Sequence, residues 1–398
     1  ALTFIGWLSI YAALYNEGYE LFDFTKKYGK QFIWMIIAYF IAIIILFFNW
    51  KFFDGFAYII YFISILSLIG VLIFGEEING AKSWFDFGLF SIQPAEFAKC
   101  ATCLAVAKFL SGLNIKMSSI KTKLIVSCLI LAPTLFIILQ NDTGSALVYA
   151  SFLIVLYRFG LPANVLIFSI VAALIFITSI ILSKIIVFSA FILIAVLFFL
   201  ISKRGIKEFT IISFFLLLSI GFNSSIDYVF EKVLEPHQVT RIMILLGQES
   251  DPQGAGYNVN QSKIAIGSGG LIGKGFLKGT QTKFNFVPEQ STDFIFCTIG
   301  EEWGFIGSTF LLILYGAFLF RLIHIAERQR SVFSKLYGYG VAGVFFFHIT
   351  INIAMTIGLA PVIGIPLPFI SYGGSSLWAF TILLFIFINL DSHRLQVL

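Results

Sequence analysis

Long apolar runs, separated by short polar connections, make up most of the hydrophobic pattern of the chain. The runs cover about residues 2–15, 31–49, 57–75, 93–112, 123–139, 144–157, 163–182, 185–202, 208–222, 294–322, 338–359 and 375–390. A helix needs roughly 20 apolar residues to cross a bilayer, and in lipid only helices and closed barrels satisfy all backbone polar groups. The pattern therefore predicts an all-α polytopic membrane protein with about twelve spans.

Composition excludes the main alternative, a soluble globular domain. Of the 398 residues, 59% are hydrophobic and only 12% are charged, and the mean hydropathy is +0.96, whereas soluble domains are about 25% charged. The net charge of +5 is spread over several loops, which gives no basis for a nucleic-acid partner. The chain opens inside an apolar run, so we expect a cytosolic tail to precede Ala1.

The distribution of Lys and Arg predicts the orientation in the membrane. With a cytosolic N-terminus, the excess of basic residues falls on the inner connections, as the positive-inside rule requires. These inner residues are Lys51, Lys108, Lys116, Lys121, Lys123, Arg158, Lys203, Arg204, Lys207, Arg321, Arg328, Arg330, Lys335 and Arg394. The short outer connections carry fewer, namely Lys26, Lys27, Lys30, Lys82, Lys99 and Lys184.

One long polar stretch, residues 223–293, interrupts the apolar pattern on the outer side. Glycine recurs in it among Gln, Asn, Ser and Lys, and it ends on Asp293, directly before the apolar run that starts at Phe294. Long polar loops are usually functional or disordered, but residues such as Ile264 and Phe286 give this one apolar groups to bury. We expect it to fold as a large outer loop within a single integral membrane domain, residues 1–398.

The other unusual polar clusters fall on the same outer side. They are residues 79–88, 93–99, 140–144 and 366–376. Several helix ends therefore meet the large loop at one face of the membrane. The topology predicts a site on that outer face.

Glu96 and Lys99 are candidates because they lie three residues apart, on one face of a helix. Ionisable residues within a membrane segment usually face the protein interior and are candidates for function. A structural ion pair that locks this helix to a neighbour explains them equally well.

The two carboxylates Asp142 and Asp293 each have a structural alternative. Asp142 lies in QNDTG, and a tight turn explains it better than catalysis, because Asn, Asp and Gly are favoured in turns. Asp293 stands at the mouth of the following helix, where a carboxylate can meet a membrane-bound substrate. Ser291, Thr292 or Asp293 would also serve as the N-cap of that helix, and on physical grounds alone the cap is favoured.

Two irregular stretches complete the candidates. The glycine-rich residues 267–275 lack the features of a P-loop, although their backbone N–H groups and nearby lysines such as Lys263 can hold an anionic headgroup. The prolines of residues 361–368 prevent a regular helix. Irregular backbone at membrane depth is tolerated where it is buried or lines a cavity, and it leaves Ser371 and Tyr372 as candidates beside a re-entrant turn.

Several stretches resemble the SEDS family, membrane glycosyltransferases that polymerise peptidoglycan from lipid II. The match runs in order through NGAKSWFDFGLFSIQPAEFAK, QNDTGSA, the glycine-rich loop with VPEQSTDF, IGEEWGFIGS and NIAMTIGLAPVIGIPLPFISYGGSS. KGTQ and GIPLPFISYGG are more similar to the elongation branch (RodA type) than to the division branch (FtsW type). The resemblance implies a bundle of about 10 conserved helices, to which residues 159–222 add about 2 inserted ones.

The resemblance also implies the site. The essential carboxylate of the family's PExHTDF motif falls on Asp293, which would act as the catalytic base. The residues implied to bind substrate around the same cavity are Glu96, Lys99, Arg241, Lys263, Glu289 and Ser371. Ser291 replaces the histidine of the motif, so no imidazole function carries over.

Partners and location follow from the resemblance as well. It implies lipid II as substrate, a class B penicillin-binding transpeptidase and other elongation-complex proteins as partners, and the bacterial cytoplasmic membrane with the catalytic face outside. A divalent cation, Mg²⁺ or Mn²⁺, would be held loosely with substrate phosphates, since the sequence has no recognisable ligand cluster. The alternatives are a division glycosyltransferase, a lipid II flippase or transporter working by alternating access, and a scaffold that needs neither Asp293 nor the loop glycines.

Overall fold

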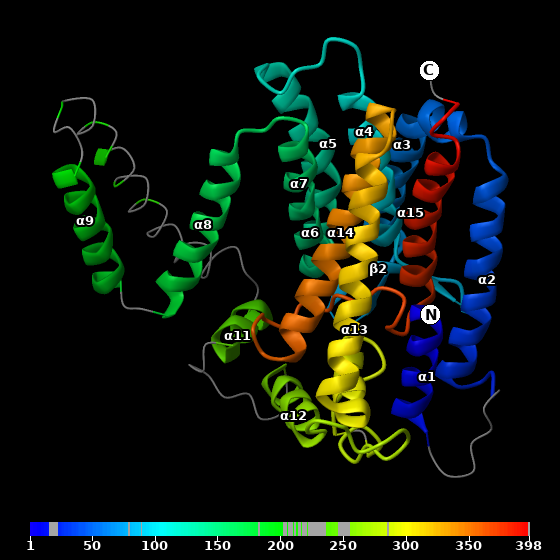
Figure 1. Cartoon of the computed structure of the whole chain (residues 1–398). Helices are drawn as coiled ribbons and strands as arrows, with labels where there is room; N and C mark the ends of the chain where they lie inside the picture. Colours follow the sequence, from blue (N-terminus) through cyan, green and yellow to red (C-terminus); the bar gives the residue numbers. More distant parts are fainter. Residues whose placement is uncertain are drawn as a thin grey trace. The chain divides into compact units, whose positions relative to one another are not determined.

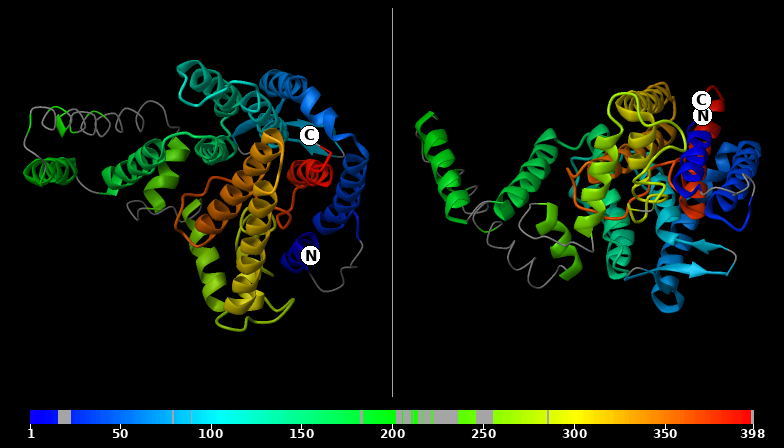
Figure 2. Two further views of the ribbon diagram at one scale, coloured as in Figure 1. Left: turned by 45° about the horizontal axis from the view of Figure 1, so that its top comes forward. Right: turned by 90° about the horizontal axis from the view of Figure 1, so that it is seen from below.

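The computed structural model describes residues 1–15, 23–78, 80–88, 90–181, 184–201, 205, 210, 212–213, 216, 221, 236–245, 255–284 and 286–396. The chain divides into two compact units (Figures 1 and 2). The first is Ala1–Leu161 with Tyr257–Leu398, and the second is Pro162–Gly256. Of the predicted site residues, Arg241 belongs to the second unit and the others to the first.

The first unit is a helical bundle. Its elements are α1 (Leu2–Leu14), α2 (Lys27–Phe47), α3 (Trp50–Phe74), α4 (Pro94–Leu110), α5 (Ile120–Leu139), α6 (Thr143–Val148), η1 (Tyr149–Ser151), α7 (Phe152–Arg158), α12 (Ala255–Ser268), α13 (Ile295–Glu327), α14 (Val332–Thr356) and α15 (Gly374–Ser392). Within the described residues, α2, α3, α5, α13, α14 and α15 are long and apolar enough to cross a membrane. The prediction of a polytopic all-α membrane protein is confirmed.

The centre of this unit is formed by α4, α14 and α15. Small residues allow these helices to approach closely, as is usual between membrane helices. A Cβ on Gly340 of α14 would lie 2.9 Å from Cys103 Sγ of α4, and one on Gly338 would lie 2.5 Å from the Phe387 ring of α15. The outer helices instead expose large apolar side chains, such as Phe62 on α3 and Phe320 on α13. Lipid is the solvent that such a surface requires.

A small antiparallel sheet, absent from the sequence-based prediction, follows α3. It consists of β1 (Glu76–Ile78), β2 (Ala81–Asp86) and β3 (Ser91–Ile92), in the order β1-β2-β3. Gly80 has a φ of +83° in the first turn, a conformation that glycine adopts without strain. The backbone N–H of Lys82 donates to the Gln140 carbonyl at 3.0 Å, so the polar clusters at 79–88 and 140–144 lie together.

Residues 257–284 and 286–293 of the large loop belong to the first unit and fold against the first turns of α13. Gly304 interrupts α13 with a φ of +63°, and the loop backbone fills the break. The N–H groups of Phe305 and Ile306 donate to the Gly270 and Leu271 carbonyls at 2.9 and 3.1 Å. The expected folding of the loop is therefore observed for residues 255–284 and 286–293.

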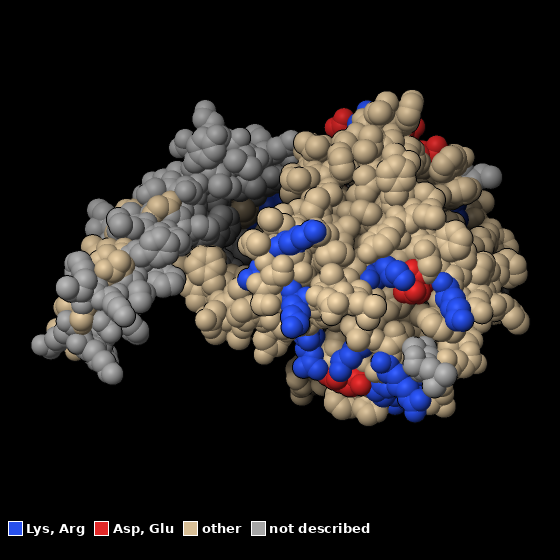
Figure 3. Space-filling view, turned by 90° about the horizontal axis from the view of Figure 1, so that it is seen from above, with Lys and Arg blue, Asp and Glu red and all other residues tan. Residues whose placement is uncertain are grey.

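Basic side chains gather at one end of the first unit. The α2–α3, α4–α5 and α13–α14 connections lie there together with the end of α15 (Figure 1). Viewed onto this end, many Lys and Arg side chains stand on the surface (Figure 3), and Lys116, Lys121 and Arg330 are among its exposed residues. The opposite end carries α12 and the loop residues between α12 and α13 that the structure describes (Figure 1). Which of these two ends faces the cytosol stays a prediction.

The second unit contains α8 (Ala163–Ile181), α9 (Lys184–Ile201) and α11 (Pro236–Leu245). The first two match the apolar runs predicted at 163–182 and 185–202. Most of the run predicted at 208–222 lies outside the described residues. Gly254, a position in the large loop that the predicted topology puts on the outer side, lies outside them as well. The assignment of residues 159–222 as inserted helices stays a prediction.

The orientation can be tested by cysteine labelling. Ser118, between α4 and α5, and Lys278, in the large loop, are both exposed at opposite ends of the first unit. We expect Lys278→Cys to react with a membrane-impermeant maleimide added to intact cells, and Ser118→Cys to react only after permeabilisation. A variant without additional cysteines corrects for Cys128, which is exposed on α5. Labelling of both positions from the same side would contradict the predicted topology.

Candidate active site

Asp293 lies directly before α13, at the end of the unit that carries the large loop (Figure 1). The N-cap of α13 is Phe294, not Asp293, and its side chain makes no capping hydrogen bond. The capping alternative for Asp293 is therefore wrong. The residue is half-buried, so its carboxylate is within reach of a substrate at the surface.

The carboxylate of Asp293 lies beside the proline-rich segment, residues 361–368. A Cβ on Gly364 would lie 3.5 Å from Asp293 Oδ2, and Gly364 has a φ of +70°. The backbone of Asp293 is held from α14, because Asn352 Nδ2 donates to the Asp293 carbonyl at 2.8 Å and to the Ile365 carbonyl at 2.6 Å. A single buried amide thus fixes Asp293 relative to residues 361–368.

His348 makes a second connection between α14 and the same segment. It lies four residues before Asn352, on the same helix face, and its Nδ1 is 3.2 Å from the Pro366 carbonyl. His348 is 1% exposed and Asn352 is fully buried. The sequence analysis named neither residue. The available signal was the presence of two polar side chains inside an apolar run.

Glu96 and Lys99 face the interior of the bundle, as predicted for a pair in a membrane helix. They are 3% and 1% exposed, and Lys99 Nζ lies 2.8 Å from Glu96 Oε1. Lys99 Nζ is also 2.9 Å from His348 Nε2 and stands 5.7 Å from the centre of the Phe380 ring. The ion pair is therefore linked to α14, and through it to the segment beside Asp293.

Ser371 follows the proline-rich segment and bonds it to the residues before Asp293. Its hydroxyl donates to the Thr292 carbonyl at 2.6 Å and accepts from the Leu367 N–H at 2.8 Å, and the residue is 4% exposed. The next N–H, of Tyr372, donates to the Ser291 carbonyl at 2.9 Å. Residues 291 and 292 are thus bonded to Tyr372 and Ser371, and Asn352 connects Asp293 to Ile365. Ser371, predicted to bind substrate, is engaged with the backbone.

Replacement of Ser371 by Ala should destabilise the protein by about 1–3 kcal/mol, because it leaves two buried backbone groups without their partner. The glycan yield should fall with it, since Thr292 precedes Asp293. Thermal unfolding in detergent measures the first effect, and Ser376→Ala is the control because its hydroxyl only donates to the Gly373 carbonyl at 3.2 Å. Equal unfolding temperatures for the two variants would contradict this assignment.

Tyr372 follows Ser371, and its side chain is a further group that can exchange a proton. Burial raises its pKa to about 12. A group with so high a pKa stays protonated at neutral pH and cannot act as a base there. Tyr372 is therefore not a candidate base.

The remaining predicted residues lie at different distances from this centre. Glu289 is exposed, with a φ of +54°, and its Oε2 accepts from Thr292 Oγ1 at 2.9 Å, so it lies in the turn before Asp293. Lys263 is exposed on α12, and its Nζ lies 3.6 Å from a Cβ built on Gly358, just after α14. Arg241 lies on α11 in the second unit.

Asp142 is a structural residue, as predicted. It is the N-cap of α6, where Oδ1 accepts from the Ser145 N–H at 2.9 Å, and its Oδ2 accepts from Gln93 Nε2 at 2.7 Å. A Cβ on the neighbouring Gly144 would lie 2.2 Å from the Ile363 carbonyl oxygen. The turn therefore packs against the proline-rich segment, where only glycine leaves enough room.

Glu301 organises the large loop and was missed by the sequence analysis. It is fully buried, and its carboxylate accepts from Lys274 Nζ at 2.7 Å and from the backbone N–H groups of Thr280, Gln281 and Thr282 at 2.8, 2.9 and 2.9 Å. The paired carboxylates of GEE at the start of an apolar run were the available signal. Lys274, one of the lysines of the glycine-rich residues 267–275, is therefore engaged with Glu301.

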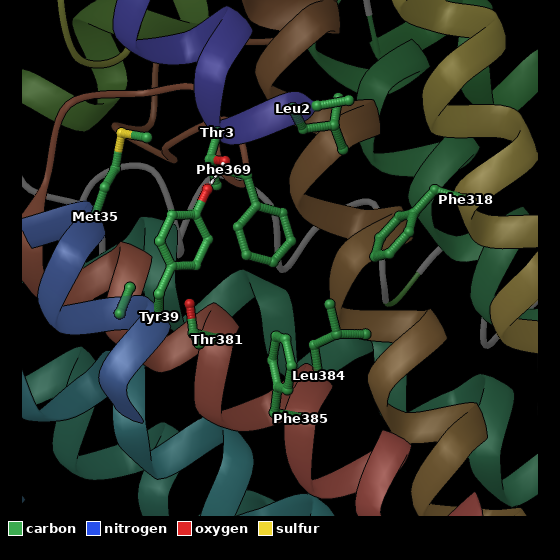
Figure 4. A pocket seen from close by; sticks show the side chains of 11 residues that line it. Leu2, Thr3, Met35, Tyr39, Phe318, Phe369, Thr381, Leu384 and Phe385 are labelled. Carbon is green, nitrogen blue, oxygen red and sulfur yellow. Dashed lines mark hydrogen bonds between the residues drawn. The ribbon is translucent and has the colours of Figure 1, made fainter. Parts of the chain in front are cut away.

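An apolar pocket of about 280 Å³ lies between α1, α2, α13 and α15 (Figure 4). Phe369 of the proline-rich segment forms part of its wall, and its φ is +65°. The Phe369 ring centre lies 6.0 Å from that of Phe380, the residue that covers Lys99. The pocket thus adjoins the segment that frames Asp293.

The described residues around Asp293 do not form a ligand cluster for the predicted divalent cation. Within the described residues, no three His, Cys, Asp or Glu side chains gather closely enough to hold a metal ion. Mg²⁺ and Mn²⁺ prefer several oxygen ligands, and one exposed and one half-buried carboxylate do not supply them. A cation held mainly by substrate phosphates stays a prediction.

Comparison with known proteins places the chain in a family. The family model FTSW_RODA_SPOVE, described as "Cell cycle protein", matches residues 1–189 and 187–396. The peptidoglycan glycosyltransferase RodA of Treponema pallidum is 35% identical, covering 99% of this chain and 96% of the relative. The peptidoglycan glycosyltransferase MrdB of Escherichia coli K12 is 34% identical, covering 97% and 91%.

A solved structure supports the same assignment. It is described as "Structural coordination of polymerization and crosslinking by a peptidoglycan synthase complex". It has a TM-score of 0.73 and 26% identity, covering 99% of this chain and 96% of the other. The match spans both chains almost entirely, so the likeness concerns the whole fold. The chain therefore belongs to the FtsW/RodA/SpoVE family, with relatives of the RodA type that match it over nearly its full length.

Proposed function

We propose that the chain polymerises lipid II into glycan strands, with Asp293 as the general base. The chain is a peptidoglycan glycosyltransferase of the elongation type, as its family and its full-length relatives named RodA and MrdB indicate. The observation that carries the assignment of the base is the half-buried carboxylate of Asp293. It stands at the position of the family's essential carboxylate, next to a backbone that α14 and Ser371 hold in place.

The reaction makes one glycosidic bond and breaks one bond to phosphate. The 4-hydroxyl of an acceptor N-acetylglucosamine attacks C1 of the donor N-acetylmuramic acid, while its proton passes to Asp293. The C1–O bond to undecaprenyl diphosphate breaks, and the electron pair leaves with the diphosphate, so that C1 is inverted. A base positioned in this way accelerates such a step by about 10²–10⁴-fold.

The leaving diphosphate requires positive charge. Lys263 is suited to supply it, because it is exposed on α12 and points to the end of α14. We assign Arg241 the same kind of role from its match to the family alone. Lys274 and Lys99 are less suited, since each is engaged with a buried carboxylate.

The partners and location follow from the same family membership. The related structure concerns a complex that coordinates polymerisation with crosslinking, so we propose a class B penicillin-binding transpeptidase as the partner of this chain. The chain is a multi-pass membrane protein. Its place would be the bacterial cytoplasmic membrane, with Asp293 on the outer side, opposite the end rich in Lys and Arg.

Purified protein in liposomes, supplied with labelled lipid II, tests this function. We expect glycan strands that a muramidase digests, and a higher yield when the transpeptidase partner is added. Transfer of lipid II between leaflets without any glycan would support the flippase alternative instead. The absence of both activities, with partner present, would leave the scaffold as the remaining interpretation.

A further inference from the structure

The Glu96–Lys99 pair is closed off from any substrate in this structure. The two side chains are each 2% exposed, and the Lys99 ammonium is already engaged by Glu96 Oε1, His348 Nε2 and the Phe380 ring. A substrate phosphate could reach Lys99 only by breaking a buried ion pair and leaving the Glu96 carboxylate buried without its partner. The pair must therefore affect the reaction through its protein contacts.

The contact with His348 has a fixed direction. A lysine ammonium has three N–H donors and no acceptor, so His348 Nε2 accepts in the 2.9 Å contact. The ring proton of the neutral imidazole then lies on Nδ1. From there it donates to the Pro366 carbonyl, 3.2 Å away. The charge on Lys99 thus determines which His348 nitrogen carries the proton, and the proton holds the Pro366 carbonyl.

Pro366 belongs to the segment that frames the proposed base. Asn352, four residues after His348 on α14, bonds the Ile365 and Asp293 carbonyls, and Gly364 runs beside the Asp293 carboxylate. Without a donor at His348 Nδ1, one of the two connections between α14 and residues 364–366 is lost. A misplacement of about 1 Å near reacting groups can lower a rate about 10²-fold.

We infer that His348 is a positioning residue. It connects the Glu96–Lys99 ion pair to the Pro366 carbonyl and so fixes the segment beside Asp293. Glu96 and Lys99 then act on the reaction through His348 and not by contact with lipid II. This inference rests on the proposed function, since it concerns the geometry of the proposed base.

Two substitutions separate the halves of this connection. The amide nitrogen of Asn takes the place of His Nδ1, so His348→Asn keeps a donor for the Pro366 carbonyl and loses the contact with Lys99. The longer side chain of Gln takes the place of Nε2, so His348→Gln keeps an acceptor for Lys99 and loses the Pro366 donor. Because the donor to Pro366 is the bond that positions the segment, His348→Asn should retain far more activity than His348→Gln.

Steady-state polymerisation of lipid II provides the measurement. We expect His348→Gln to lower kcat about 10-fold or more, with KM for lipid II unchanged within about two-fold, because no ground-state contact is lost. His348→Asn should keep kcat within about three-fold of wild type. Similar kcat values for the two variants, or a large rise in KM with unchanged kcat, would overturn the inference.

A double-mutant cycle checks the role of the ion pair. The Glu96→Gln/Lys99→Met variant removes both charges without leaving one of them buried alone. It should lower kcat when His348 is present. It should have little further effect in the His348→Asn background, where the contact with Lys99 is already lost. Additive effects would contradict the connection, and if the double variant does not fold, the comparison of Asn with Gln still decides.

These outcomes are distinguishable from a failure of the proposed function. If the wild-type protein forms no glycan with its partner present, the proposed function fails and this inference with it. If wild type polymerises lipid II while His348→Gln is equally active, only the positioning role of His348 is wrong.

Discussion

Replacement of Asp293 by Asn should give a folded protein that forms almost no glycan from lipid II. Asn keeps the shape of the side chain, and the backbone carbonyl of residue 293 stays available to Asn352. The amide cannot accept the proton of the attacking hydroxyl, so the rate should fall by about 10²–10⁴-fold. Since Phe294, and not Asp293, is the N-cap of α13, loss of a helix cap cannot account for such a fall.

The matched control is the same substitution at Asp142. Asp142 caps α6, and Asn serves as an N-cap about as well as Asp, so Asp142→Asn should polymerise lipid II at close to the wild-type rate. Glycan formation is measured in liposomes with the transpeptidase partner, and unfolding temperatures confirm that both variants are folded. Near-normal polymerisation by Asp293→Asn would exclude Asp293 as the base.

The membrane-spanning elements were predictable because one physical quantity sets them. The thickness of the hydrocarbon core fixes the length of an apolar run, and the run at 31–49 corresponds to α2 (Lys27–Phe47), as the run at 338–359 corresponds to α14 (Val332–Thr356). The break at Gly304 was not predictable in this way. It depends on loop backbone that enters α13 from residues 270–273, a contact that no hydrophobic period records.

The small sheet escaped prediction for a related reason. Its strands are short, and β2 pairs with β1 and β3 through backbone hydrogen bonds. An Asn-Gly pair at 79–80 was a hairpin signal, but the surrounding polar residues gave no clear alternation. The sheet fixes the polar cluster at 79–88 beside the Gln140 carbonyl.

The candidate site was predictable only where charge marked it. Asp293, Glu96 and Lys99 are conspicuous because ionisable groups are costly in a membrane protein. Their connections run through backbone carbonyls of Thr292, Ile365 and Pro366, which the identity of a side chain does not reveal. Ser371 illustrates the difference, since its position was predicted but its two bonds to the backbone were not.

Replacement of Glu301 on α13 by Gln should destabilise the protein and loosen the large loop. The two carboxylate oxygens accept from Lys274, from Thr282 Oγ1 and from the backbone N–H groups of residues 280–282. Gln supplies one acceptor oxygen and turns an NH₂ group toward the remaining donors, so buried N–H groups lose their partner. Breaking a buried charged network of this kind costs about 3–5 kcal/mol.

Glu302→Gln is the control. The neighbouring Glu302 carboxylate is also buried, but among the described loop residues it accepts from the Leu277 N–H alone, at 3.1 Å. A Gln oxygen can take over that bond, so its cost should stay within about 1 kcal/mol. Thermal unfolding in detergent compares the two variants, and limited proteolysis at Lys278, which is exposed, reports on the loop itself. Glu301→Gln should unfold at a lower temperature and be cleaved faster. If the two variants behave alike, the Glu301 carboxylate does not hold the loop against α13, and the lysine that it engages, Lys274, becomes available to bind the leaving diphosphate.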